Sequence, residues 1–202
     1  MIAIIDYDAG NIKSVEKAVK KLGYDCVITR DVETLEKADK LILPGVGAFG
    51  DAMNNLKEFG LIEVIKRLVL EEKKPILGIC LGLQLMFDSS EESEGVEGLG
   101  LLKGKIVRIP EGEGRKIPHM GWNSLEFPKK SILFDGVTKG SFVYFVHSYY
   151  LCADDENDVA ATTNYGVLIQ ASVERNNIFA TQFHPEKSSS VGMKILKNYL
   201  EA

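Results

Sequence analysis

The segment from Lys74 to Gln84 constrains the fold of this chain more than any other. Residues Pro75 to Ile79 form a short apolar run, typical of a strand buried on both faces, and helical spacing follows from Leu81 to Phe87. Cys80 lies on the turn between them, with one glycine two residues before it and another two residues after it. A side chain on so sharp a turn crowds the nearby backbone, which favours flanking residues without a Cβ atom. The pattern G-x-C-x-G is the cysteine counterpart of the nucleophile elbow of α/β enzymes.

Cys80 by itself has two interpretations. Most free cysteines are small buried hydrophobic residues without a chemical role. A cysteine at a helix N-terminus, however, lies near unpaired N–H groups and the positive end of the helix dipole, which favour a thiolate and can stabilise an oxyanion. Only other parts of the chain can decide between these roles.

Composition and charge limit the classes of protein to consider. The 202 residues are enough for one well-buried α/β domain spanning 1–202, and no linker-like change in composition indicates a second. The net charge of −5 and the absence of a basic run argue against a nucleic-acid partner. The N-terminus turns acidic after a short apolar run, and no apolar stretch reaches membrane-spanning length. Because three cysteines at unrelated spacings fit a reducing compartment, we expect a cytoplasmic protein that does not bind membranes.

The pattern of apolar residues predicts an α/β fold with a mostly parallel central sheet and flanking helices. The first half alternates strands, expected at Met1–Tyr7, Cys26–Ile28, Lys40–Leu43 and Pro75–Ile79, with helices, expected at Ile12–Leu22, Thr34–Ala38 and Leu61–Val69. Asn11 is the expected N-cap of the first helix and Gly23 its stop. The second half predicts an added antiparallel portion, with strands at Lys105–Ile109, Trp122–Phe127, Phe142–Tyr150, Val159–Asn164, Leu168–Val173 and Ile178–Gln182. Glu91–Gly100 is expected to be an exposed loop and Ser188–Ala202 the closing helix.

The loop after the third strand literally matches a dinucleotide-binding fingerprint. Residues Gly45 to Gly50 read G-x-G-x-x-G, which proposes a nucleotide-binding oxidoreductase as an alternative. That fingerprint normally follows the first strand, and its next strand ends in an acidic residue, whereas here that strand ends at Cys80. Glycines of a tight surface loop, or backbone N–H groups directed at a substrate oxygen near Cys80, explain the match better.

A thiolate that attacks a carbonyl needs a base, and the base needs an orienting group. His184 is the best candidate for the base, because Glu186 follows two residues later. Pro185 favours an extended backbone before it, and an extended segment would place both side chains on one face. The order Cys80, His184, Glu186 is that of a coherent triad. No metal site is expected, since the histidines are far apart in sequence and no paired-ligand motif is present.

These residues together resemble a known family. The segments Gly78–Gln84 and His184–Glu186 are similar to the signature of class I (triad) glutamine amidotransferases, and Pro44–Gly47 resembles their oxyanion loop. The resemblance implies that Cys80 attacks glutamine, that His184 and Glu186 complete the triad, and that no cofactor takes part. It further implies oxyanion donors at Leu81, Val46 and Gly47, and substrate contacts at Gly45, Gln84, His147, Ser148 and Tyr149.

Two further segments, Asp6–Asn11 and Pro118–Asn123, resemble one branch of that family, the glutaminase subunits of imidazole glycerol phosphate synthases. This resemblance implies a heterodimer with a (β/α)₈-barrel cyclase subunit that receives the ammonia in histidine biosynthesis. Met120, Trp122 and Asn11 are expected to contact that partner, and burial of Trp122 in the chain's own core is the competing interpretation. Amidotransferase subunits of anthranilate or aminodeoxychorismate synthesis, and a non-catalytic docking subunit, stay open as alternatives.

Overall fold

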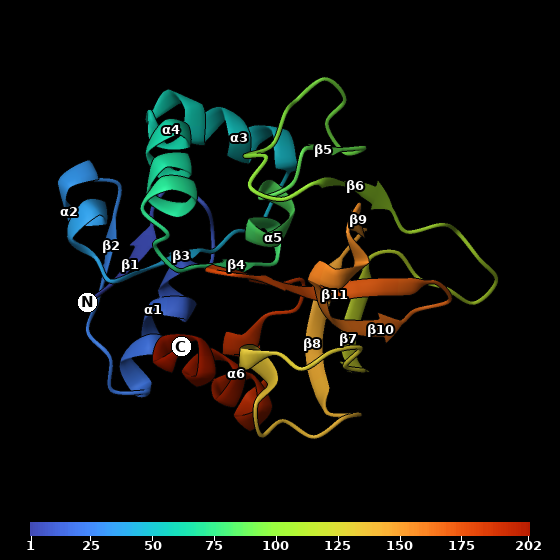
Figure 1. The fold of residues 1–202 in the computed structure, drawn as a ribbon. Helices are drawn as coiled ribbons and strands as arrows, with labels where there is room; N and C mark the ends of the chain where they lie inside the picture. The colour runs from blue at the N-terminus through green and yellow to red at the C-terminus, as the bar shows by residue number, and fades with distance from the viewer.

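The computed structural model describes residues 1–202 and has strands alternating with helices in its first half (Figure 1). These elements are β1 (Ile2–Ile5), α1 (Ile12–Lys21), β2 (Cys26–Thr29), α2 (Val32–Lys37), β3 (Lys40–Leu43), α3 (Phe49–Glu58), α4 (Leu61–Lys66), the π-helical turn η1 (Arg67–Glu71), β4 (Ile76–Ile79) and α5 (Leu81–Leu85). The predicted alternation is therefore confirmed. The sequence pattern did not predict α3, which follows the glycine-rich loop.

The second half is mostly strands. They are β5 (Ser89–Ser90), β6 (Gly104–Arg108), β7 (His119–Ser124), β8 (Phe142–His147), β9 (Tyr149–Ala153), β10 (Val159–Asn164), β11 (Leu168–Arg175) and β12 (Ile178–Thr181). Three 3₁₀ turns, η2 (Ile132–Phe134), η3 (Glu156–Asp158) and η4 (Pro185–Lys187), and the helix α6 (Ser189–Glu201) complete the chain.

One large sheet runs through the molecule in the order β2-β1-β3-β4-β12-β11-β9-β6-β5, with β10 paired to β11. The strands from β2 to β12 are parallel, and β11, β9, β10 and β6 add antiparallel pairs, as predicted. A separate antiparallel pair consists of β7 and β8. Because β4 and β12 are parallel neighbours, Cys80 after β4 and the segment after β12 emerge at the same edge of the sheet.

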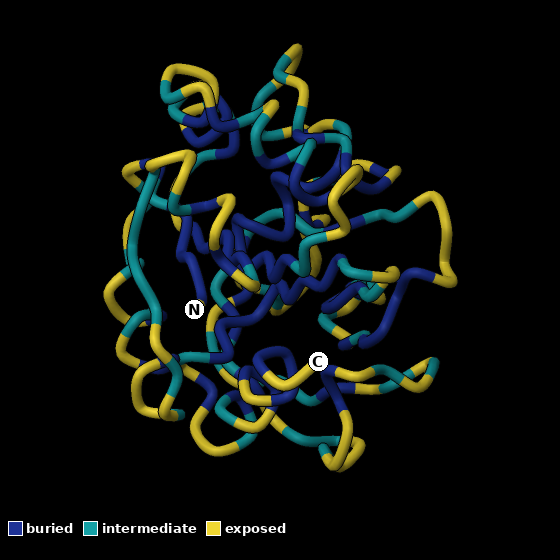
Figure 2. The backbone as a smooth tube through the Cα atoms, turned by 60° about the vertical axis from the view of Figure 1, so that its left-hand side comes forward, coloured by how far each residue is buried: buried dark blue, intermediate teal, exposed yellow.

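Helices cover both faces of the parallel strands. In Figure 1, α2, α3, α4 and α5 lie on one side, and α1 and α6 lie on the other. The strands bury both faces, since Ala3 and Ile5 belong to one apolar cluster and Ile2 and Ile4 to the other. Figure 2 shows the buried backbone at the centre and the exposed segments in the peripheral loops.

Several predicted boundaries were wrong. The segment Phe142–Tyr150 is two strands in different sheets, β8 and β9, separated at Ser148. The strand predicted at Trp122–Phe127 begins earlier, at His119, and ends at Ser124. The loop Glu91–Gly100 is only partly exposed, since Leu99 within it is fully buried. No helix is long and apolar enough to cross a membrane.

Candidate active site

The turn that carries Cys80 is strained. Cys80 has φ 55° and ψ −107°, a conformation that residues with a side chain rarely adopt. The flanking glycines are required by packing, since a Cβ atom on Gly82 would lie 1.8 Å from the carbonyl oxygen of Leu43, and one on Gly78 would lie 2.8 Å from the backbone of Gly82. The steric reason predicted for the G-x-C-x-G pattern is therefore present in the structure.

His184 and Glu186 lie beside each other, but not in the predicted extended segment. His184 is extended, with φ −95° and ψ 99°, and Pro185 then begins the 3₁₀ turn η4. His184 Nδ1 is 2.8 Å from Glu186 Oε1, and both side chains are almost fully buried. The backbone of His184 is also held in place, because its carbonyl accepts a hydrogen bond from Ser188 Oγ at 2.6 Å and its N–H donates to Tyr144 at 3.0 Å.

The electrostatics of this pair suit proton transfer. Burial by itself lowers the pKa of His184, but the neighbouring Cys80 and Glu186 outweigh it and raise the pKa to about 9. Because Nδ1 donates to the carboxylate, Nε2 is the ring atom left to exchange a proton, and it is buried without a hydrogen-bond partner. An imidazole held this way can take a proton from a thiol and return it to a leaving group.

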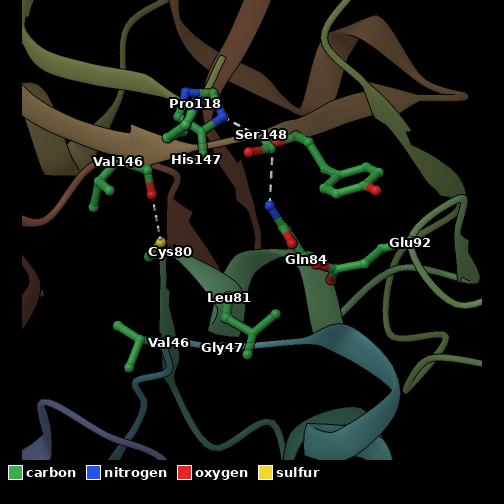
Figure 3. A pocket seen from close by; sticks show the side chains of 11 residues that line it. Val46, Gly47, Cys80, Leu81, Gln84, Glu92, Pro118, Val146, His147 and Ser148 are labelled. Carbon is green, nitrogen blue, oxygen red and sulfur yellow. Dashed lines mark hydrogen bonds between the residues drawn. The ribbon is translucent and has the colours of Figure 1, made fainter.

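Cys80 opens into a pocket of about 320 Å³ (Figure 3). Its sulfur lies 3.9 Å from the carbonyl oxygen of Val146 across the pocket, and Val46 and Gly47 lie on the opposite side. The remaining lining residues are Leu81, Gln84, Glu92, Pro118, His147, Ser148 and Tyr149. The volume is at the lower end of ligand sites, which suits a molecule of amino-acid size.

The glycine-rich loop is held against the elbow from behind. The Tyr7 hydroxyl donates to the Pro44 carbonyl at 2.5 Å, and burial keeps Tyr7 a neutral donor by raising its pKa far above the usual value. A Cβ atom on Gly45 would lie 2.1 Å from that hydroxyl, so only glycine fits there. The Leu81 amide donates to the Gly45 carbonyl at 3.4 Å, a long bond with which a substrate oxygen would compete.

Two buried histidines support the pocket wall formed by β8 and β9. His147 Nδ1 donates to the Tyr149 carbonyl at 2.8 Å, so its Nε2 must accept from His119 Nδ1 at 3.0 Å. His119 Nε2 in turn lies 3.3 Å from the amide nitrogen of Asn123. Burial lowers the pKa of His119 to about 4 and that of His147 to about 3, so both stay neutral.

The residues expected at a partner surface differ in their placement. Met120 and Trp122 are 62% and 50% exposed on β7, so the alternative of a core Trp122 is wrong. Asn11 is the N-cap residue of α1, as predicted, in a left-handed conformation with φ 68°, but its side chain makes no capping hydrogen bond. Its Nδ2 instead donates to Glu186 Oε1 at 2.7 Å.

The structure also bears on residues that the sequence analysis did not single out. Glu92 and Val146 line the pocket, and no short motif marks them. Tyr7 braces the loop and Pro118 lines the pocket; both lie in segments that carry the family resemblance, but neither was assigned a role there. The first two amides of α3, which a dinucleotide-binding turn would present to phosphates, already donate to Glu92 and Ser93. This arrangement disfavours the nucleotide-binding alternative. No cluster of three or more His, Cys, Asp or Glu side chains could hold a metal ion.

The site has an elbow cysteine beside a histidine–glutamate pair, on an α/β sheet with helices on both faces. These features define a class of enzyme with a cysteine nucleophile, and comparison with known families identifies the family. Residues 3–202 match the family Glutamine amidotransferase class-I, to which this chain belongs. The chain is 54% identical over 204 residues to the imidazole glycerol phosphate synthase subunit HisH of Geobacillus kaustophilus, covering 99% of this chain and 96% of the relative. It is 51% identical over 200 residues to the subunit of the same name in Moorella thermoacetica, covering 99% and 94%.

Solved structures agree on the fold. A crystal structure of a glutamine amidotransferase superposes with a TM-score of 0.78 over 100% of this chain and 98% of its own, at 21% identity. The structure of PurLQS from Thermotoga maritima gives 0.75 over 99% and 97%, also at 21% identity. These two structures agree on the fold, and the family match over residues 3–202 makes the chain a glutamine amidotransferase. Both curated relatives are named as subunits of imidazole glycerol phosphate synthase and not of anthranilate or aminodeoxychorismate synthesis.

Proposed function

We propose that this chain is the glutamine-hydrolysing subunit of an imidazole glycerol phosphate synthase, and that residues 1–202 act as one amidotransferase domain. The observation that carries the proposal is the strained elbow of Cys80, with the bonded pair His184 and Glu186 beside it and a pocket of amino-acid size in front. Relatives with this name, identical at half of their residues or more, supply the pathway.

The first half of the reaction forms a thioester. Because its pKa is raised to about 9, His184 holds on Nε2 the proton of the Cys80 thiol, and the thiolate attacks the carboxamide carbon of glutamine to form a C–S bond. The oxyanion accepts hydrogen bonds from the Leu81 amide and from an amide of Val46 or Gly47. When the tetrahedral intermediate collapses, its C–N bond breaks and His184 returns the proton, so that ammonia leaves.

The second half hydrolyses the thioester. His184 takes a proton from water, the hydroxide attacks the same carbon, and the C–S bond breaks to release glutamate. The Cys80 sulfur leaves as a thiolate beside the imidazolium, which restores the resting enzyme. Glu186 accepts from Nδ1 throughout and so keeps Nε2 as the atom that transfers protons.

Two groups of residues bind the substrate in this proposal. Gln84, His147, Ser148 and Tyr149 contact the amino-acid end of glutamine, a role supported by their position around the pocket. Gly45 lets the glycine-rich loop approach the reacting carbonyl, because any side chain there would meet Tyr7. Since the Leu81 amide already donates to Gly45, full turnover requires that this long bond be exchanged for one to the oxyanion.

Ammonia in water becomes protonated and loses its nucleophilicity, so direct transfer to a partner is required. The proposed partner is a (β/α)₈-barrel cyclase subunit, forming a heterodimer that makes imidazole glycerol phosphate and an aminoimidazole carboxamide ribonucleotide. Met120 and Trp122 are exposed apolar side chains on one strand, a composition that suits docking. Asn11, half-buried beside Glu186, would lie where such a partner meets the triad.

Labelling with an electrophilic glutamine analogue tests the nucleophile. Mass spectrometry should find the adduct on Cys80 in the wild type and none in Cys80→Ala. Cys26 and Cys152 are partly exposed and serve as internal controls for non-specific alkylation. An adduct confined to either of them would refute the assignment.

A second experiment tests the division of labour. With the partner present, Cys80→Ala should abolish glutamine-dependent synthesis of the cyclase product and retain the synthesis that uses added ammonia. The matched control Cys152→Ala should retain both. Loss of the ammonia-dependent reaction in Cys80→Ala would contradict the proposal. Glutamine hydrolysis measured with and without partner, and with and without the partner's ligand, then reports how far the oxyanion site depends on docking.

A further inference from the structure

Gln182 lies next to the nucleophile, and the proposed mechanism does not use it. It follows β12 directly, two residues before His184, and it is fully buried. Its backbone is fixed on both sides, because its N–H donates to Ala171 at 2.8 Å and the preceding Thr181 carbonyl accepts from the Cys80 amide at 2.8 Å. Its side-chain nitrogen lies 3.7 Å from the Cys80 sulfur.

The orientation of the Gln182 amide follows from its neighbours. The Tyr149 carbonyl can only accept, so the Gln84 atom that faces it at 3.1 Å is the nitrogen Nε2. The same nitrogen lies 3.1 Å from Gln182, so the atom it faces there is the oxygen Oε1. The Gln182 nitrogen must then face the sulfur.

We infer that Gln182 is a further catalytic residue, whose side-chain N–H donates to the Cys80 sulfur and stabilises its thiolate form. A thiolate accepts a hydrogen bond more strongly than a thiol does, so the amide favours transfer of the thiol proton to His184. In that step an S–H bond breaks and an N–H bond forms on Nε2, and the amide keeps its own protons. The same donor stabilises the thiolate that leaves when the thioester is hydrolysed. This inference rests on the proposed function only for that last step.

The position of Gln182 separates this role from substrate binding. Gln182 does not line the pocket, whereas Gln84 does, so a molecule in the pocket meets Gln84 first. Gln84 therefore connects the pocket lining at Tyr149 to the side-chain amide of Gln182, because its nitrogen donates to both. Each buried amide in this series of hydrogen bonds needs partners for its polar atoms, and these partners fix it in a single orientation.

The test uses iodoacetamide, a neutral electrophile that needs no glutamine pocket, and measures the alkylation rate of the Cys80 peptide by mass spectrometry. Gln182→Met keeps an unbranched side chain of similar length but lacks the N–H donor. Its Cys80 should react about tenfold more slowly than in the wild type at pH 7, the equivalent of about 1.4 kcal/mol. At pH 10, above the ordinary pKa of a cysteine thiol, the two rates should agree within about twofold.

Controls distinguish this role from a structural one. Gln170→Met changes a glutamine on β11 whose carboxamide accepts a hydrogen bond from Ala153 and makes none to Cys80, and it should leave the alkylation rate unchanged. Gln182→Glu places a carboxylate beside the sulfur and should slow alkylation at pH 7 further than Gln182→Met does. Equal rates for the wild type and Gln182→Met at pH 7 would overturn the inference, and so would the same deficit persisting at pH 10, which indicates blocked access.

A measurement on the wild type covers the case in which the variants do not fold. The side-chain amide protons of Gln182, followed by NMR, should shift when Cys80 is alkylated, and no shift would overturn the inference. Glutamine hydrolysis is assayed separately. If the wild type hydrolyses no glutamine in complex with its partner, the proposed function fails, while the alkylation comparison still decides the role of Gln182.

Discussion

Two buried imidazoles make the stability of this fold depend on pH. His119 and His147 are 2% and 6% exposed, and burial lowers their pKa values from 6.5 to about 4 and about 3. Because the unfolded chain binds these protons first, the stability is fully present above pH 6.5 and is lost as the pH falls toward the folded values. At pH 5 the solution is 1.5 units below the ordinary pKa, and each unit is worth ~1.36 kcal/mol. Keeping one imidazole neutral in the folded protein therefore lowers the free energy of unfolding by about 2 kcal/mol, and keeping both neutral lowers it by about 4 kcal/mol.

His184 contributes with the opposite sign. Its pKa is raised to about 9, so its stabilising contribution is fully present below pH 6.5 and is lost as the pH rises through 9. Lowering the pH from 7.5 to 5 therefore restores about 1.4 kcal/mol from this residue. The three histidines together leave a net loss of about 2.6 kcal/mol, a large share of the stability of an ordinary domain.

The assay is urea unfolding of the wild type and of His119→Phe at pH 7.5 and pH 5. A phenyl ring fits the same stack, since the His119 ring lies between Phe145 and Tyr165 with centroids 4.7 and 3.9 Å away. The variant lacks a donor to His147 at both pH values, so that cost cancels when its stability at pH 5 is compared with its stability at pH 7.5. The titrations of the carboxylates are the same in both proteins and cancel when the variant is compared with the wild type. We expect the variant to lose about 2 kcal/mol less than the wild type on acidification.

A matched control and a clear negative result accompany this prediction. Tyr165→Phe keeps the stack and removes no titrating imidazole, so it should lose as much stability on acidification as the wild type does. If His119→Phe also loses as much as the wild type, then His119 binds its proton equally well in the folded protein, and the reasoning from burial is refuted. The imidazole protons of His119 and His147, followed by NMR, should not titrate above pH 5.

Three further predictions concern the elbow, the loop and the exposed strand. Gly82→Ala places a Cβ atom 1.8 Å from the Leu43 carbonyl and should destabilise by about 3 kcal/mol or more, seen as a lower Tm in calorimetry; an unchanged Tm would contradict the packing argument. Tyr7→Phe removes the donor to Pro44 and should cost about 1–3 kcal/mol in urea unfolding together with slower glutamine hydrolysis; unchanged turnover would mean that the loop needs no brace. Trp122→Ala should change stability by less than about 0.5 kcal/mol but weaken partner binding at least about tenfold in calorimetric titration; equal binding would remove Trp122 from the interface.

The parts of the fold that depend on local sequence could be predicted. β3 and β10 begin and end at the predicted residues, because apolar runs bounded by turn residues specify short buried strands. The elbow could also be predicted, since the two glycines beside Cys80 answer a local steric demand. The break at Ser148 could not, because an apolar run does not reveal which of two sheets each half joins.

Contacts between residues far apart in the sequence decided the remainder. Asn11 matched the preferences of an N-cap, but its side chain bonds Glu186, 175 residues away. That bond uses the side-chain nitrogen as donor, whereas a cap would use the side-chain oxygen as acceptor, so the distant carboxylate and not the helix amides sets the orientation of the side chain. Gln182 likewise has no signal of its own, since its role follows from the parallel pairing of β4 with β12, which brings it beside Cys80.

The two faces of β7 connect the proposed docking surface to the nucleophile. Because side chains alternate along a strand, Met120 and Trp122 point to solvent while His119 and Asn123 point inward. From Asn123, hydrogen bonds run through His119 and His147 to the Tyr149 carbonyl, and from there through Gln84 and Gln182 to the Cys80 sulfur. In this series of hydrogen bonds, each imidazole and side-chain amide is held in one orientation by its neighbours. Both histidines stay neutral. A shift of β7 on docking would therefore change the geometry of the hydrogen bond at the Cys80 sulfur, and no residue between them would change its charge.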